Sequence, residues 1–158
     1  MKSIVAVCLV LMTVSSSGFE EANRVGDPNA RNFFLFSTAA GNYTIRQDGM
    51  GEVATPKGMR RVFMLKLGMK GRLERVCFGE HEGDLLLFYE LQDGRAYLLR
   101  MNQQNRKFRW LTDLREHTDH DPAEFQLPVI QGDLVIFTDA QGRRIEVNKA
   151  GGTVVRAQ

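Results

Sequence analysis

The sequence predicts an all-β protein, built as an antiparallel meander of about ten strands. Short apolar runs recur along the chain, separated by turns that contain glycine, whereas a sustained apolar stripe at helical spacing is missing. A phrase of strand, glycine turn and strand occurs three times. The phenylalanines that close its first strands are spaced about 50 residues apart, a period typical of a repeated β-unit: Phe36, Phe88 and Phe137.

The first copy of the phrase predicts strands over residues 33–37 and 43–47, joined by a turn at Gly41. A short strand over 52–54 follows. We then expect a strand over 61–67, in which alternate residues are apolar, and a glycine turn that leads into a strand over 72–78.

The second copy begins with residues 84–91, which are almost continuously apolar. Such a run is expected for a strand covered on both faces. Asp93-Gly94 is a strong hairpin signal, and it predicts a second strand over 95–101. A further strand over 107–110 alternates charged and aromatic residues.

The third copy predicts strands over 133–138 and 143–148, and a last short strand over 153–156. Between the second and third copies, only residues 111–121 could form a turn or two of helix. Residues 32–158 are therefore expected to form a single β-rich repeat domain.

Residues 1–17 have the pattern of a signal peptide. Lys2 precedes an apolar run of about 11 residues, too short to span a bilayer, and small residues follow at 15–18. We therefore expect an exported protein, periplasmic or extracellular, that is not inserted in the membrane after cleavage. The polar segment 18–31 is expected to be a flexible N-terminal loop.

Charge and cysteine content exclude several classes of protein. Lys and Arg total 21 against 19 for Asp and Glu, and the basic residues are scattered, so nucleic-acid binding is not expected and the charges are interpreted as solvated surface. Cys8 lies in the signal segment, which leaves Cys77 alone and rules out a disulfide scaffold. Cys77 stands in an apolar stretch and is interpreted as a buried small hydrophobe.

The second unit, from Gly83 through Asp93-Gly94 to Trp110, resembles a β-propeller blade of the PQQ-like (BamB-like and quinoprotein-like) repeat family. In that family a strand ends in a glycine turn, a Tyr-Ala-Leu-type strand follows, and a further strand closes with a tryptophan. The third unit matches the first two strands but has Val154-Val155 in place of the tryptophan, and the first unit also lacks it. The resemblance implies three blade-like units and a scaffold for protein assembly, with no quinone or other cofactor expected.

A single small antiparallel β-barrel is the alternative architecture, because about 140 residues in eight to ten strands suit a ligand carrier of lipocalin size. The candidate ligand or partner contacts are Tyr97, Arg100 and Trp110. For Trp110 the sequence offers a second interpretation, in which the ring packs between sheets while the neighbouring charges face water.

The sequence contains no recognised catalytic motif, and we expect a protein that is not an enzyme. The segment Glu116–Asp121 places His117 and His120 three residues apart with aspartates nearby, a possible metal set that we interpret as a solvated loop. No metal site is therefore predicted. The expected function is protein interaction or assembly, with an unknown protein partner or with further copies of the chain.

Overall fold

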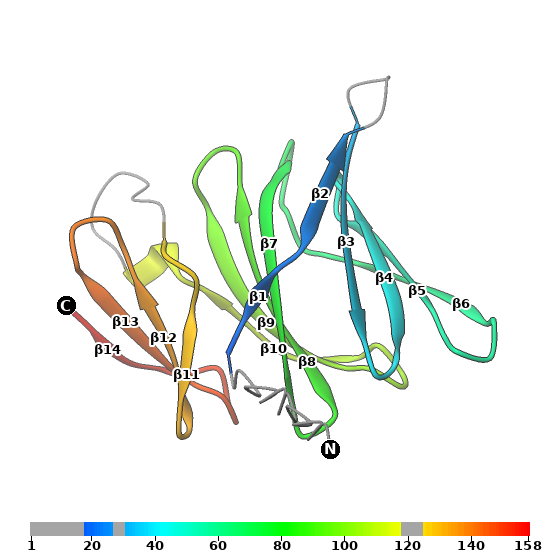
Figure 1. Cartoon of the computed structure of the whole chain (residues 1–158). Coiled ribbons are helices and arrows are strands. Elements are labelled where there is room, and N and C mark those ends of the chain that lie inside the picture. Colours follow the sequence, from blue (N-terminus) through cyan, green and yellow to red (C-terminus); the bar gives the residue numbers. More distant parts are fainter. Residues whose placement is uncertain (1–17, 27–30, 118–124) are drawn as a thin grey trace, which may run out of the picture.

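The computed structural model describes residues 18–26, 31–117 and 125–158, which form three antiparallel β-sheets lying side by side (Figure 1). The predicted signal peptide, residues 1–17, lies outside the described residues. The helical content of the described ranges is one 3-10 turn, η1 (Arg115–His117). None of their helical structure is long and apolar enough to cross a membrane.

The all-β prediction and the three units are confirmed, and each unit forms its own sheet. The first sheet comprises β2 (Asn23–Gly26), β3 (Asn32–Thr38), β4 (Gly41–Arg46), β5 (Met50–Ala54) and β6 (Arg60–Met64). The second comprises β1 (Glu20–Glu21), β7 (Leu73–His81), β8 (Asp84–Leu91), β9 (Ala96–Asn102) and β10 (Phe108–Asp113). The third comprises β11 (Val129–Gln131), β12 (Leu134–Thr138), β13 (Arg144–Asn148) and β14 (Val154–Ala157). The alternative of one closed barrel is wrong, because the strands divide into three separate hydrogen-bonded sheets.

The repeated phrase occupies adjacent strands in every sheet: β3–β4, β8–β9 and β12–β13. Its closing phenylalanines, Phe36, Phe88 and Phe137, are all buried. Phe88 and Phe137 meet across the second and third sheets, with ring centroids 5.1 Å apart. The period seen in the sequence is therefore the period of a sheet whose apolar strands pack on the next sheet.

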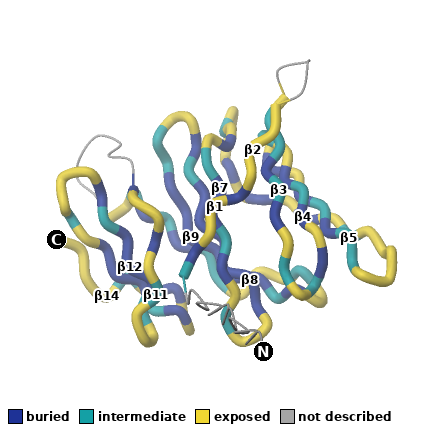
Figure 2. Tube along the Cα trace, in the orientation of Figure 1, coloured by how far each residue is buried: buried dark blue, intermediate teal, exposed yellow. Residues whose placement is uncertain are grey.

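The second sheet is covered on both faces, as the apolar run of β8 predicted. Leu85, Leu87 and Tyr89 belong to the core shared with the first sheet. Leu86 and Phe88 belong to the core shared with the third sheet. Figure 2 shows this buried centre flanked by sheets whose far ends are exposed.

The N-terminal segment 18–26 runs across all three sheets (Figure 1). Gly18 bridges to Val129 of β11, β1 pairs with β7, and β2 pairs with β3. The expectation of a loop over 18–31 is therefore wrong for β1 and β2. Their sequence is polar because these strands are held mainly by backbone hydrogen bonds at sheet edges, where most side chains stay in water.

Two other expectations need correction, and one strand was not predicted. The strand predicted over 61–67 ends at Met64, although Leu65 and Leu67 beyond it are buried. Strand β10 continues to Asp113, so within residues 111–117, the described part of the segment expected to form helical turns, η1 is the helical element. Strand β11 is short and partly exposed, and it carried no clear pattern in the sequence.

We expect Phe19→Ala to lower the free energy of unfolding by about 3 kcal/mol, because Phe19 is buried between the second and third sheets. The adjacent exposed change Glu20→Ala should alter it by less than about 0.5 kcal/mol. Urea unfolding of both variants measures the difference. Equal effects would show that the segment does not hold the sheets together.

Candidate functional site

A buried ion pair lies on the face of the second sheet that meets the third sheet. The Nε atom of Arg100 donates to Oδ2 of Asp84 at 2.7 Å, and both side chains are almost fully buried. Arg109 from β10 also donates to Asp84. Arg100 then crosses to the third sheet, where its Nη1 donates to the carbonyl of Lys149 at 3.1 Å.

The charge on Asp84 is maintained despite its burial. Burial alone raises the pKa of a carboxyl group. In Asp84 this effect is outweighed by the hydrogen bonds and positive charges of Arg109 and Arg100, which hold the pKa below its ordinary value. The ion pair therefore fixes the relative position of two sheets, because Arg100 bonds to both.

Trp110 fixes the same boundary from β10. Its indole N–H donates to the carbonyls of Lys149 at 3.2 Å and of Ala150 at 3.1 Å. The ring lies so close to Gly152 that a Cβ there would come within 2.5 Å of it. The interpretation that Trp110 packs between sheets is confirmed.

The structure does not bring the three predicted contact residues together. Arg100 and Trp110 meet the third sheet, whereas Tyr97 belongs to the core on the opposite face of the second sheet. There the ring of Tyr97 stacks on Tyr89 with centroids 5.2 Å apart. A ligand or partner role for these residues stays a prediction, and their observed contacts are internal.

The other predicted chemical groups are placed as follows. Cys77 is fully buried, and burial raises the pKa of its thiol to about 12. Glu116 and His117 are exposed, while residues 118–121 of the histidine and aspartate segment lie outside the described residues. Within the described ranges, no group of three or more metal-ligating side chains of the His, Cys, Asp and Glu types comes together.

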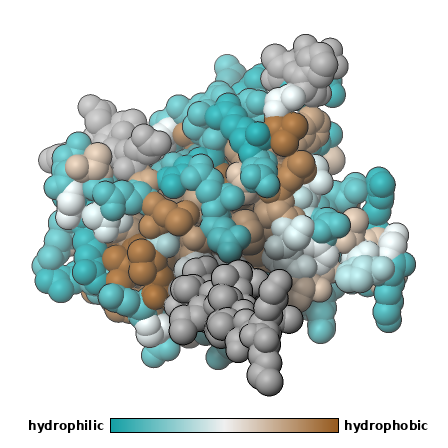
Figure 3. Space-filling model, viewed as in Figure 1, coloured by the Kyte–Doolittle hydropathy of each residue, from teal (hydrophilic) through white to brown (hydrophobic). Residues whose placement is uncertain are grey.

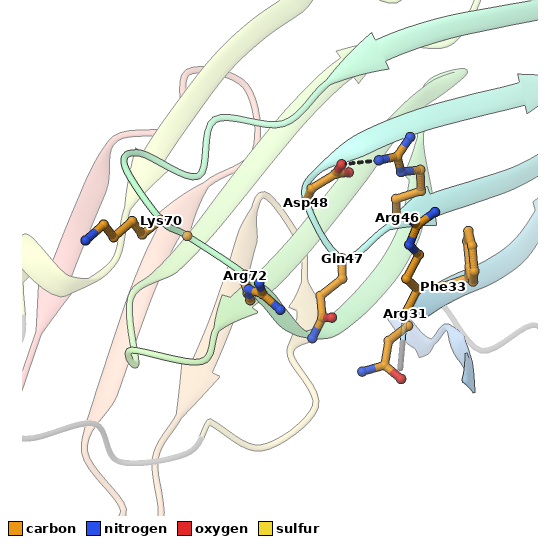
Figure 4. A pocket seen from close by; sticks show the side chains of 9 residues that line it. Arg31, Phe33, Arg46, Gln47, Asp48, Lys70 and Arg72 are labelled. Atoms are coloured by element: carbon orange, nitrogen blue, oxygen red, sulfur yellow. Dashed lines mark hydrogen bonds and ion pairs between the residues drawn. The ribbon is translucent and has the colours of Figure 1, made fainter. Parts of the chain in front are cut away.

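A basic pocket lies where the end of the first sheet meets the start of the second (Figure 4). The term denotes a cavity of about 500 Å³ lined by Arg31, Asn32, Phe33, Arg46, Gln47, Asp48, Lys70, Gly71 and Arg72. Sequence reasoning missed it, because its basic residues come from the residue before β3, the end of β4 and the segment before β7. The available signal was the clustering of charge in two turns, at 46–48 and 70–72.

The outer face of the first sheet, which points away from the second sheet, carries exposed apolar side chains. Met50 and Met64 are direct neighbours on β5 and β6, and Val62 lies two residues from Met64 on the same face. The exposed fraction is 39% for Met50, 55% for Met64 and 66% for Val62. We call Met50, Val62 and Met64 the open face. Figure 3 shows a second apolar area on its left, over the third sheet. Val129 of β11 in that sheet is exposed, as is Leu127 shortly before it.

We expect Gly152→Ala to destabilise the protein more than Gly142→Ala does. Both glycines have positive φ, 72° and 81°, so each alanine carries a similar backbone strain of about 1–2 kcal/mol. Only at position 152 would the new Cβ clash with Trp110; at 142 it meets open space. An additional loss of about 1–3 kcal/mol is expected at 152, measured by urea unfolding followed by tryptophan fluorescence. Equal losses would refute the close packing of Trp110.

We expect Asp84→Asn to lower stability by about 3 kcal/mol at neutral pH, because it leaves buried Arg100 without its counter-charge. The folded pKa of Asp84 is lowered, so its contribution is present above the unfolded value of about 3.9 and is lost as pH falls through the folded pKa. The difference between wild type and variant should therefore shrink below about pH 4.

The control for this change is Asp93→Asn, which removes an exposed ion pair with Arg95. It should cost less than about 1 kcal/mol. Denaturant unfolding across the acid range compares the two variants. A loss at Asp84 that is no larger than at Asp93, or that does not depend on pH, would contradict the buried ion pair.

By sequence, neither a protein-family model nor a curated protein matches the chain. By structure, the chain is similar to BamB from Moraxella catarrhalis, with a TM-score of 0.54 and 14% identity, over 87% of this chain and 39% of that one. A periplasmic gluconolactonase of Pseudomonas aeruginosa, PpgL, matches with a TM-score of 0.43 and 12% identity, over 90% of this chain and 39% of that one. The chain thus spans well under half the length of these proteins. The similarity to BamB confirms the expected resemblance at the level of the fold: three antiparallel sheets arranged like the blades of a β-propeller.

Proposed function

We propose that this chain is an exported, non-catalytic module for protein interaction or assembly, which binds through the open face of the first sheet. One observation carries the proposal. Met50, Val62 and Met64 lie together and exposed on the face of β5 and β6 that is opposite the core. Clustered exposed apolar side chains of this kind mark interaction sites more often than scattered ones do.

The second sheet shows how a sheet face of this protein is covered. Both of its faces are buried against a neighbouring sheet, whereas the first sheet has this contact on one face alone. Methionine is flexible and fits irregular surfaces, which suits a face that must adapt to a partner. The ion pair of Arg60 with Glu52, at 3.4 Å, lies beside the apolar residues and gives the face a polar rim like that of known interfaces.

The edge of the sheet offers a second means of attachment. Strand β6 is the last strand in the sheet order, so one side of its backbone is available for pairing. In Figure 1 the β5–β6 hairpin projects away from the other sheets, where a partner could reach it. The proposed export rests on the leader pattern of residues 1–17, and the proposed scaffold role rests on the propeller-like fold.

Self-association is the form in which we test this proposal, since another copy brings the same open face and the same sheet edge. We expect the purified protein to have a mass above that of one chain, rising with concentration, in size-exclusion chromatography with light scattering. The double change Val62→Lys with Met64→Lys should shift it to a monomer, because lysines on an edge strand oppose sheet association.

Met69→Lys is the matched control. Met69 is 91% exposed but lies in the segment between β6 and β7 and does not belong to the open face, so its variant should keep the wild-type mass. A wild-type monomer at every concentration, or a double variant that associates as wild type does, would contradict the proposal.

A further inference from the structure

The basic pocket differs from the rest of the surface in its charge. Four of its nine lining residues are cationic, and Asp48 is the single acidic one. Elsewhere, most arginines lie beside carboxylates, as Arg24 does with Glu74 at 2.8 Å. Within the described residues, no carboxylate lies within ion-pair distance of Lys70 or Arg72, so the pocket holds a local excess of positive charge in a nearly neutral protein.

The wall of the pocket is fixed by hydrogen bonds within the first sheet and from the first sheet to the second. Gln47 donates its backbone N–H to the carbonyl of Asn32 at 3.0 Å, and its own carbonyl accepts from Leu73 at 2.9 Å. The side-chain amide of Gln47 also donates to the Leu73 carbonyl at 3.4 Å. The turn after β4 is therefore tied to the segment before β7, and the hollow between them is held in place by backbone contacts.

The cationic side chains that line this hollow come from three separate segments of the chain. Figure 4 shows Arg46 turned toward Asp48, Arg31 beside Phe33, and Lys70 directed away from the others. Arg46 forms an ion pair with Asp48, whose Oδ1 also accepts the backbone N–H of Met50 at 3.1 Å. Asp48 thus occupies the position that an incoming anion would compete for.

We propose that the basic pocket binds a small, multiply charged oxyanion of the phosphate type. Guanidinium groups donate paired hydrogen bonds that match phosphate oxygens, and several of them together favour a dianion over a single negative charge. The ring of Phe33 forms an apolar wall beside the arginines, where the organic part of a phosphate ester would rest. This site is separate from the open face, because none of Met50, Val62 and Met64 lines it, although Arg46 of the pocket donates to the sulfur of Met50 at 3.6 Å.

The test measures binding of inorganic phosphate and of phenyl phosphate to the full chain by isothermal titration calorimetry at low ionic strength, with sodium chloride as the ionic-strength control. We expect saturable binding of phosphate that chloride does not reproduce. Tighter binding of phenyl phosphate would assign the ligand to an ester, and equal affinities would assign it to the free oxyanion; both results support the site.

Three variants separate binding at this site from general charge effects. Arg72→Gln should weaken binding about fivefold or more, because it removes a charged donor. Asp48→Asn should tighten binding, because it frees Arg46 while its amide oxygen can still accept from Met50. Arg156→Gln, which removes an exposed arginine of the third sheet outside the pocket, should leave the affinity unchanged.

The opposite signs expected at positions 72 and 48 cannot both arise from a loss of folding. Absence of saturable binding, or binding that Arg72→Gln and Asp48→Asn leave unchanged, would overturn the proposal. These results do not depend on the mass of the protein in solution. The oxyanion site and the open face can therefore fail separately.

Discussion

The burial of both faces of the second sheet is the constraint on which the rest of the structure depends. Strand β8 presents Leu85 and Leu87 to one neighbour and Leu86 and Phe88 to the other, so neither outer sheet could leave without exposing a full row of large apolar side chains to water. The outer sheets have no such requirement on their far faces. The second sheet is therefore buried on both faces, whereas each outer sheet is buried against a neighbouring sheet on one face.

Apolar burial alone does not fix the relative position of stacked sheets. Hydrogen bonds across the sheet boundaries do so. Between the second and third sheets, Arg100 and Trp110 both donate to the Lys149 carbonyl, which permits one relative position of the sheets and disfavours sliding. Between the first and second sheets, Tyr43 donates to Gln103 at 2.9 Å, and that glutamine donates in turn to Glu80. The N-terminal segment adds backbone pairing across the edges of all three sheets.

Local patterns in the sequence predicted the central strands of the fold and their turns. The apolar alternation and glycine turns located β8, β9, β12 and β13, and Gly94 has the positive φ that its hairpin turn requires. Strands β1 and β2 were missed, because an edge strand needs backbone groups more than apolar side chains. The partner of Arg100 could have been sought, since a charge inside the apolar run of β9 must be neutralised. The identity of that partner depends on the register between β8 and β9, which no single strand encodes.

The basic pocket illustrates a different limit. Arginines spread along a chain were interpreted as solvated surface charge, and for several of them the structure shows exposed ion pairs, such as that of Arg24 with Glu74. Whether a few of them gather depends on how the turn of one sheet meets the first strand of the next, a relation set by packing across the sheet boundary. A repeat of stacked sheets brings such turns together at each boundary, while its strands remain committed to the core. Changes of residues in these turns can therefore create or remove a charged site at the rim of the sheets, at little cost to folding.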